Sequence, residues 1–310
     1  METKPVYLSF DIEVVVSKRS KNTESIITVV AGAMEIARLL EDRKLKGTFF
    51  VSLSSKDKSI DRDEYLSRVK FLIKSLSQFQ HIEIQPHLHC HNLPMSFVSE
   101  SDNFNDYTSQ QQLQMLTWAK DVMAECGVSV TGFRAGGYKT DAKYYDVLKQ
   151  AGYKYSSTLD QTLVPDIDLI TGNCDRKPVV KEIDGIKEVN VTSVKVKSIK
   201  PGVTEVVNLS PDFFTIESVQ PYFKALDFIN VNFHSFSMLS NRLARENHKN
   251  QFSLNLRYML LEKPFNQIAR KLDLHTYQLN TVFAKELIKW LDEFQSSEYK
   301  TCFYCEQVNV

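Results

Sequence analysis

The sequence predicts an α/β fold of about seven strands, most of them separated by helices. Short apolar runs of strand length recur along the chain, and stretches with apolar residues at helical spacing lie between them. No internal repeat or Pro/Ser-rich linker divides the 310 residues. We therefore expect a single domain over residues 1–310, with a parallel sheet, open or closed into a barrel, and helices packed outside.

The first half of the chain carries the clearest alternation. Apolar, β-branched and aromatic residues predict strands, and apolar residues at three- and four-residue spacing predict helices. The predicted strands are residues 6–10, 47–51, 82–86 and 130–133, and the predicted helices are residues 26–45, 63–79, 109–126 and 141–150.

The second half is less regular. It gives strand-like runs at residues 153–156, 188–196, 203–209, 227–234 and 301–304, and one amphipathic helix at residues 284–294. Pro211 and Asp212 are expected to open a short helix with an acidic first turn.

Charge and composition exclude several classes of protein. Lysine plus arginine equals aspartate plus glutamate at 38 each, so no net field favours nucleic acid or an anionic membrane. No run approaches the roughly 18 apolar residues of a membrane span. The residues before the first strand do not resemble an export signal, and the five cysteines are scattered. These features predict a cytoplasmic protein without a membrane span.

Cys302 and Cys305 form the one cysteine pair with metal-site spacing. No second pair of ligands lies near them in the sequence, and they belong to the apolar run TCFYC. We favour buried strand cysteines over a structural zinc site.

Acidic residues follow the first predicted strand. Asp11 and Glu13 are separated by one residue, so in extended backbone both carboxylates project to the same side. The carboxyl ends of parallel strands meet at one rim, where ligands and catalytic groups collect. The pair suggests a general base and a metal ligand, although such acids are also common in helix caps and solvated turns.

Three histidines follow the third predicted strand, at His87, His89 and His91. His87 and His91 are four residues apart, and on one helical turn such a pair can bind one divalent cation. In that geometry His89 points away, and we expect it to support the site from outside or to be structural. Packing alone gives no reason to crowd three imidazoles, so the cluster predicts a metal site.

Two other strands end in basic side chains. Arg134 follows the fourth predicted strand and precedes Gly136 and Gly137, which would let backbone approach a ligand closely. An arginine there needs an anionic partner. His234 ends a late apolar run, where it could act as a general acid, although a lone histidine is also common as a satisfied rim residue.

Four segments, SFDIE, HLHCH, FRAGGY and NFHSF, resemble in this order the motifs of the polysaccharide deacetylase family, carbohydrate esterases with the NodB-homology domain. The resemblance covers roughly residues 6–234. It implies a distorted (β/α) barrel of about seven parallel strands with helices outside. It also implies a hydrolase that removes an N-acyl group, above all acetyl, from an amino sugar.

Carried over by motif, the resemblance makes Asp11 the general base, Arg134 the residue that orients it, and His234 the general acid. In the mechanism that follows, a backbone N–H at Gly137 or Tyr138 would stabilise the oxyanion.

The resemblance also implies a metal site formed by Glu13, His87 and His91. A carboxylate with two imidazoles leaves a coordination position open for chemistry, and we expect zinc, with cobalt, nickel, manganese or iron as alternatives.

The motifs depart from the commonest family pattern in three places. Ile12 separates the two acids, no proline follows Arg134, and the stretch at residues 156–160 lacks the aromatic residue usual in the family. These differences bear on substrate shape more than on reaction type.

The predicted substrate is an acylated amino sugar, such as a nucleotide- or lipid-linked saccharide of surface-glycan assembly. Two alternatives are a non-catalytic member that binds saccharide, and a hydrolase of a non-sugar amide or imide on the same barrel. The polar segment at residues 237–277 is predicted to be either a lid over the substrate or a solvated insertion.

Overall fold

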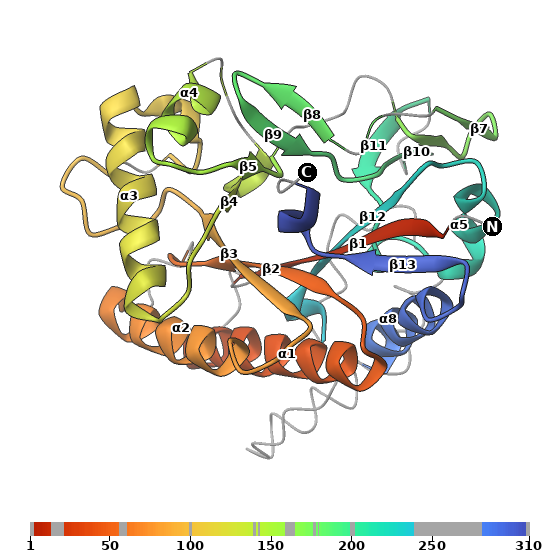
Figure 1. The fold of residues 1–310 in the computed structure, drawn as a ribbon, viewed down its shortest axis with the longest axis horizontal. Helices are drawn as coiled ribbons and strands as arrows, with labels where there is room; N and C mark the ends of the chain where they lie inside the picture. The colour runs from red at the N-terminus through yellow and green to blue at the C-terminus, as the bar shows by residue number, and fades with distance from the viewer. Residues whose placement is uncertain are drawn as a thin grey trace.

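The computed structural model describes residues 3–13, 22–55, 61–98, 101–138, 141, 143–158, 165–175, 178, 180–198, 202–238 and 281–307. A curved sheet of mostly parallel strands forms the centre, and helices lie outside it (Figure 1). The predicted fold class, a distorted barrel of parallel strands with helices outside, is confirmed.

The main sheet contains nine strands among the described residues, in the order β12-β1-β2-β3-β4-β5-β9-β8, with β13 paired to β1 off this path. Neighbouring strands pair in parallel except for the β8–β9 hairpin. The strands are β1 (Lys4–Ile12), β2 (Gly47–Ser52), β3 (Ile82–Leu88), β4 (Gly132–Ala135), β5 (Tyr155–Ser156), β8 (Val180–Ile183), β9 (Ile186–Val189), β12 (Ile229–His234) and β13 (Tyr299–Cys302).

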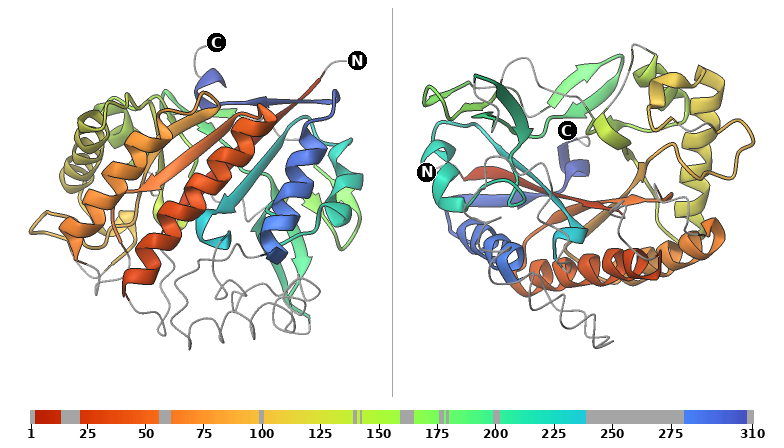
Figure 2. Two further views of the ribbon diagram at one scale, coloured as in Figure 1. Left: turned by 90° about the horizontal axis from the view of Figure 1, so that it is seen from below. Right: turned by 180° about the vertical axis from the view of Figure 1, so that it is seen from behind.

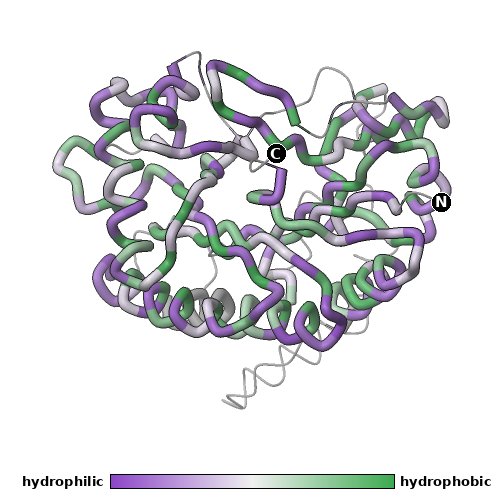
Figure 3. Tube along the Cα trace, viewed as in Figure 1, coloured by the Kyte–Doolittle hydropathy of each residue, from purple (hydrophilic) through white to green (hydrophobic). Residues whose placement is uncertain are grey.

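The long helices cover the outer side of this sheet (Figure 2). Hydrophobic and hydrophilic residues alternate along their coils, so each helix packs one side on the sheet (Figure 3). The helices are α1 (Asn22–Arg43), α2 (Arg62–Leu76), α3 (Ser109–Glu125), α4 (Tyr144–Gln150), α5 (Ile216–Phe223) and α8 (Thr281–Phe294), with short 3₁₀ helices η1 (Phe104–Asp106), η2 (Gly136–Tyr138), η3 (Ser235–Ser237) and η5 (Tyr304–Gln307).

Side chains of the central strands alternate between two environments, as extended backbone requires. In β1, Leu8 and Phe10 face outward and belong to the core shared with the helices. Tyr7 faces inward into a second apolar cluster, and Asp11 faces inward onto a buried arginine. The inner face of the barrel is therefore partly polar, and this face carries the site.

The barrel closes between β9 and β12 without a regular strand ladder. The backbone N–H of Thr192 donates to Asn230 O at 3.1 Å, and the N–H of Asn232 donates to Leu209 O at 3.0 Å. The Thr192 hydroxyl oxygen accepts from the N–H of Asn230 at 2.9 Å. These bonds satisfy backbone groups at an irregular seam and so hold β12 in place.

A second, smaller sheet lies beside this seam and was not predicted. Its four strands run in the order β11-β10-β6-β7 within the described part of the chain. They are β6 (Ile167–Asp168), β7 (Asn173–Cys174), β10 (Ser193–Lys197) and β11 (Thr204–Asn208). The predicted run at residues 188–196 is thus divided between β9 and β10, which belong to different sheets.

One predicted helix begins later than expected. Residues 211–213 form a turn, and α5 begins at Ile216 after Thr215. Asp212 does not begin the helix because its backbone N–H is held by Ser210 Oγ at 3.0 Å and its carboxylate is turned into the barrel mouth.

The segment predicted as a lid, residues 237–277, lies outside the described residues beyond Met238, and its role stays a prediction. In the part of the chain that is described, no helix combines the length and apolar character needed to cross a bilayer.

Candidate active site

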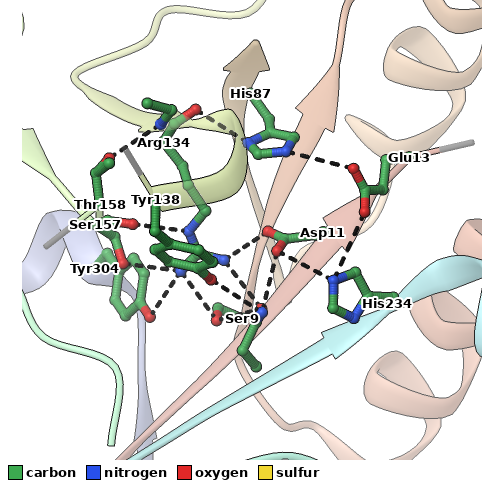
Figure 4. A network of polar contacts seen from close by, with 12 residues as sticks. Ser9, Asp11, Glu13, His87, Arg134, Tyr138, Ser157, Thr158, His234 and Tyr304 are labelled. Carbon is green, nitrogen blue, oxygen red and sulfur yellow. Dashed lines mark hydrogen bonds and ion pairs between the residues drawn. The ribbon is translucent and has the colours of Figure 1, made fainter. Parts of the chain in front are cut away.

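A buried ion pair joins the first and fourth strands at the carboxyl end of the barrel (Figure 4). Arg134 on β4 is fully buried, and its Nη1 donates to Asp11 Oδ1 on β1 at 2.6 Å. The other carboxylate oxygen of Asp11 accepts from Asn232 Nδ2 on β12 at 3.1 Å. Asp11 is therefore held from two sides. Its contact with Arg134 is the one expected if Arg134 orients it.

The remaining donors of Arg134 bind residues in or next to the neighbouring strands. Nε donates to Ser157 O at 3.0 Å, and Nη2 donates to Ser157 Oγ at 2.8 Å. Nη1 also donates to Asn232 Oδ1 at 3.0 Å. The Phe50 ring lies against the guanidinium, with its centroid 3.9 Å from Cζ. A guanidinium satisfied on every side has one orientation, so it fixes Asp11 as well.

The charge of Arg134 decides the protonation of Asp11. Burial acts to raise the pKa of Asp11, but Arg134, His87 and His234 together lower it below its usual value. Asp11 is therefore an ionised carboxylate inside the barrel, ready to accept a proton.

Glu13, His87 and His89 form the one group of metal-ligating side chains found among the described residues, and all three are buried. Glu13 Oε2 lies 2.6 Å from His89 Nε2 and 3.7 Å from His87 Nε2. The two Nε2 atoms are 3.1 Å apart. One carboxylate oxygen and two imidazole nitrogens therefore converge on one point.

The hydrogen bonds behind both histidines turn their Nε2 atoms toward this point. His87 Nδ1 lies 3.0 Å from Arg134 O, and His89 Nδ1 lies 2.8 Å from Asp102 Oδ2. Both partners accept, so each Nδ1 carries the proton. Burial lowers the pKa of His87 and outweighs the opposing hydrogen bond to Glu13. Two imidazole nitrogens and a carboxylate oxygen that converge in this way fit a divalent metal ion.

The structure differs from the sequence prediction over which second histidine belongs to this group. It brings in His89, whereas His91 Nε2 lies 3.8 Å from Asp102 Oδ1 and is not among the three. The helical turn assumed for the segment does not form, because β3 stays extended through Leu88. In extended backbone His87 and His89, two residues apart, point to the same side. We therefore revise the proposed ligand set to Glu13, His87 and His89.

The two glycines after Arg134, Gly136 and Gly137, lack a side chain for different structural reasons. A Cβ on Gly136 would lie 2.3 Å from Nδ1 of His89, so the absence of a side chain leaves room for this ring. Gly137 has a φ of 67° and nothing within 4 Å of its Cβ position. Tyr138 follows with a φ of 55°, in a region that non-glycine residues rarely occupy. The backbone turn proposed to stabilise the oxyanion is thus held in an unusual conformation.

His234 ends β12 and faces both acids of the site. Its Nε2 lies 3.8 Å from Asp11 Oδ2 and 3.7 Å from Glu13 Oε1. Its Nδ1 lies 2.7 Å from Oδ2 of Asp212, which is fully buried. Because the carboxylate accepts the Nδ1 proton, the ring has a fixed orientation and turns Nε2 toward the site.

Sequence reasoning missed three residues of this site, namely Asp102, Asp212 and Asn232. Asp102 and Asp212 lie in irregular segments, and nothing in the sequence pairs them with His89 and His234. Asn232 had a signal: in β12, polar side chains at 230, 232 and 234 alternate with apolar ones at 229, 231 and 233. This period-2 pattern marks a strand with one polar face.

The Cys302/Cys305 pair lies at the opposite end of the barrel. Cys302 belongs to the inner apolar cluster, against which Cys305 packs. Burial raises the pKa of the Cys302 thiol, and it raises that of Cys305 to about 12. The interpretation as a buried strand cysteine is confirmed for Cys302 in β13, whereas Cys305 is half-buried and lies in η5, because the strand ends at Cys302.

Comparison with protein families identifies the class to which this fold and site belong. The model of the family described as polysaccharide deacetylase matches residues 1–156, which include the first three motif segments and cover half of the chain. The chain belongs to the polysaccharide deacetylase family. Comparison with individual curated proteins gives no match.

The chain is also similar to several solved structures, all at low sequence identity. A protein from Mycobacterium smegmatis assigned as a polysaccharide deacetylase is 16% identical, with a TM-score of 0.50 over 90% of this chain and 94% of that one. A 4-alpha-glucanotransferase from Thermococcus litoralis is 10% identical, with a TM-score of 0.49 over 100% of this chain and 40% of that one. A carbohydrate esterase family 4 pseudoenzyme from Bacillus anthracis is 10% identical, with a TM-score of 0.45 over 99% and 66%.

Proposed function

We propose that this chain is a metal-dependent hydrolase that removes an N-acyl group, above all acetyl, from an amino sugar. Membership of the deacetylase family gives the reaction class. One observation carries the rest: a buried carboxylate held by arginine lies beside a three-ligand metal group and opposite a histidine. This arrangement offers a base, an electrophile site and an acid close together at the carboxyl end of the barrel.

In this proposal Glu13, His87 and His89 hold one divalent cation. Bound there, the cation supplies Lewis-acid polarisation of the acyl carbonyl and of water. The ligand set accepts several metals, and zinc is our first expectation because carboxylate and imidazole ligands suit it.

Asp11 takes the proton of the attacking water. Its carboxylate is ionised, and Arg134 and Asn232 keep it in one orientation. A base fixed in this way needs no reorganisation when the water approaches. A backbone N–H at Gly137 or Tyr138 donates to the oxyanion that forms.

His234 gives a proton to the departing amine, which is a poor leaving group unless it is protonated. Asp212 holds the Nδ1 proton, so the transferable proton is on Nε2, the atom that faces Asp11 and Glu13. Acid and base thus lie side by side, at the carboxyl ends of the paired strands β12 and β1.

Metal content and acetate release, measured together, test the proposal. We expect the purified protein to carry about one equivalent of a divalent metal and to release acetate from N-acetyl amino sugars. His87→Ala and His89→Ala should lose both metal and activity, the latter by roughly 100-fold or more. His91→Ala should keep most of its metal, and His81→Ala, which alters a histidine paired with Glu41, is the control.

Three outcomes would change the conclusion. Full metal and full activity in both His87→Ala and His89→Ala would remove the site. Metal binding with no acyl release from any substrate would indicate a non-catalytic saccharide-binding protein. Faster hydrolysis of cyclic amides or imides than of free, nucleotide-linked or lipid-linked N-acetyl amino sugars would move the chain to non-sugar substrates.

The glycines after Arg134 offer a test that leaves every ligand in place. Gly136→Ala places a methyl group against the His89 ring and should weaken metal binding by about tenfold. Gly137→Ala meets no neighbour and costs only its positive φ, about 1 kcal/mol. Equal metal affinity in the two variants, measured by competition with a chelating dye, would contradict the position given to His89.

A further inference from the structure

Tyr304 lies inside the barrel, directly behind the candidate active site. It is fully buried and begins η5, which lies at the centre of the ring of strands in Figure 1. Its ring centroid is 5.7 Å from that of Tyr7, 5.5 Å from that of Phe50 and 6.1 Å from that of Tyr155. The ring therefore fills the inner face of the barrel below the polar network.

The Tyr304 hydroxyl joins this network from below (Figure 4). It donates to Asn230 Oδ1 at 2.6 Å and accepts from Arg134 Nη2 at 3.4 Å. Asn230 cannot turn away, because its Nδ2 donates to Asn190 O at 2.6 Å. The hydroxyl is thus fixed on the side of the guanidinium opposite to Asp11.

Tyr304 also supports Arg134 indirectly, through the ring of Phe50. The Phe50 ring contacts both Arg134 and Tyr304, so the three side chains pack against one another. Protein interiors are close-packed, and a side chain in such a cluster has little room to change orientation. A change at Tyr304 is therefore transmitted to the arginine.

A buried carboxylate fixes the backbone of η5 in turn. Glu83 Oε2 accepts from the N–H of Tyr304 at 2.9 Å, and Glu83 Oε1 accepts from the N–H of Cys305 at 3.3 Å. Tyr155 OH also donates to Glu83 Oε1, at 2.9 Å. The turn that carries Tyr304 is thus attached to β3 and β5, two strands of the main sheet.

We propose that Tyr304 is a positioning residue for Arg134, and that η5 thereby completes the active site from the amino end of the barrel. Tyr304 touches no reacting atom in this proposal and acts through the guanidinium that holds Asp11. The catalytic consequence rests on the proposed function, whereas the effect on Arg134 does not.

Tyr304→Phe isolates the hydroxyl, because it keeps the ring and its packing. Tyr153→Phe is the matched control: Tyr153 is also buried, and its hydroxyl donates to one backbone oxygen, Leu116 O, at 3.1 Å. In protein labelled with nitrogen-15 at arginine, we expect the Nε–H of Arg134 to exchange with solvent about tenfold faster in Tyr304→Phe and unchanged in Tyr153→Phe. With substrate, kcat should fall about tenfold with KM within about twofold in Tyr304→Phe only.

Unchanged exchange of the Arg134 Nε–H in Tyr304→Phe, or an equal change in both variants, would overturn the proposal. The exchange measurement needs no substrate, so it decides the matter even if the wild-type protein hydrolyses nothing. Loss of the proposed function would appear separately, as absence of acyl release by the wild type. Faster exchange with an unchanged kcat in an active enzyme would also overturn the positioning role.

Discussion

Asp11 and Glu83 are both buried on the inner face of the barrel, Asp11 near its carboxyl end and Glu83 near its amino end. Asp11 faces the guanidinium of Arg134 on one side and His234 on the other. Glu83 is surrounded by uncharged donors. These are the hydroxyls of Thr48 and Tyr155, the amide of Gln85, and the backbone N–H groups of Tyr304 and Cys305.

The difference shows what separates a structural carboxylate from a chemical one in this fold. Burial is common to both and does not distinguish them. Neutral donors satisfy Glu83 completely enough to tie η5 to the sheet. At Asp11 the guanidinium of Arg134 stabilises the ionised carboxylate. The other oxygen of this carboxylate faces the imidazole of His234, a group that can exchange protons.

Asp11→Asn should give the largest effect. It removes the base and leaves the Arg134 charge uncompensated, so activity should fall by roughly 10²- to 10⁴-fold and unfolding free energy by about 3 kcal/mol. Acetate release and denaturant unfolding measure the two effects. Asp166→Asn is the control, since Asp166 is buried and binds Ser193 in the smaller sheet. If Asp11→Asn kept more than a tenth of wild-type activity, Asp11 would not be the base, and its role would not differ from that of Glu83.

Asp212, the buried carboxylate that holds His234, extends the comparison, and Asp212→Asn tests it. The change lets the ring of His234 adopt the other tautomer or rotate, and kcat should fall about 10- to 100-fold while metal content stays at the wild-type level. Steady-state kinetics with elemental analysis checks this. Loss of metal together with activity would instead make Asp212 a support of the metal group.

Glu83→Gln should produce the reverse pattern to Asp11→Asn. A glutamine amide would meet donors of Thr48 and Tyr155, so unfolding free energy should fall by about 2 kcal/mol. Activity per folded molecule should stay within about tenfold of wild type, because the base and the metal group are untouched and only the hold on η5 weakens. An activity loss as large as that of Asp11→Asn without loss of stability would give Glu83 a chemical role.

Glu286 on α8 gives the smallest and most gradual effect. Its side chain accepts from the N–H of Ile216 at 2.6 Å, and burial raises its pKa above the usual 4.5. The folded state then binds more protons than the unfolded state, so this group's contribution to stability is full at low pH and is lost as pH rises through the folded pKa. Glu286→Gln should flatten that part of the pH dependence of unfolding, by on the order of 1 kcal/mol. An unchanged profile would contradict it.

Much of the fold could be read from local patterns. The strands and helices of the first half lie within a few residues of their predicted places. In each of these segments the apolar periodicity fits either a helix or a strand, but not both. The pairing of residues 188–196 into two different sheets could not be predicted. It depends on which distant strand each half meets, and local pattern does not contain that information.

Short motifs predicted four residues that the structure brings together, namely Asp11, His87, Arg134 and His234. The second histidine of the proposed metal group was not predicted, since the choice between His89 and His91 depends on whether β3 ends at His87 or continues beyond it. Element boundaries are the least predictable feature of a sequence, and here one boundary decides a ligand. The supports at Asp102 and Asp212 depend on tertiary contacts.

The position of β13 and η5 has a consequence for biosynthesis. Lys4 in β1 pairs with Tyr299 in β13, so β1 is synthesised almost 300 residues before this partner strand. Contacts of such long sequence separation form slowly. During translation the half-built sheet therefore exposes an open strand and an unfilled interior, and this nascent state is where we expect the protein to depend most on chaperones.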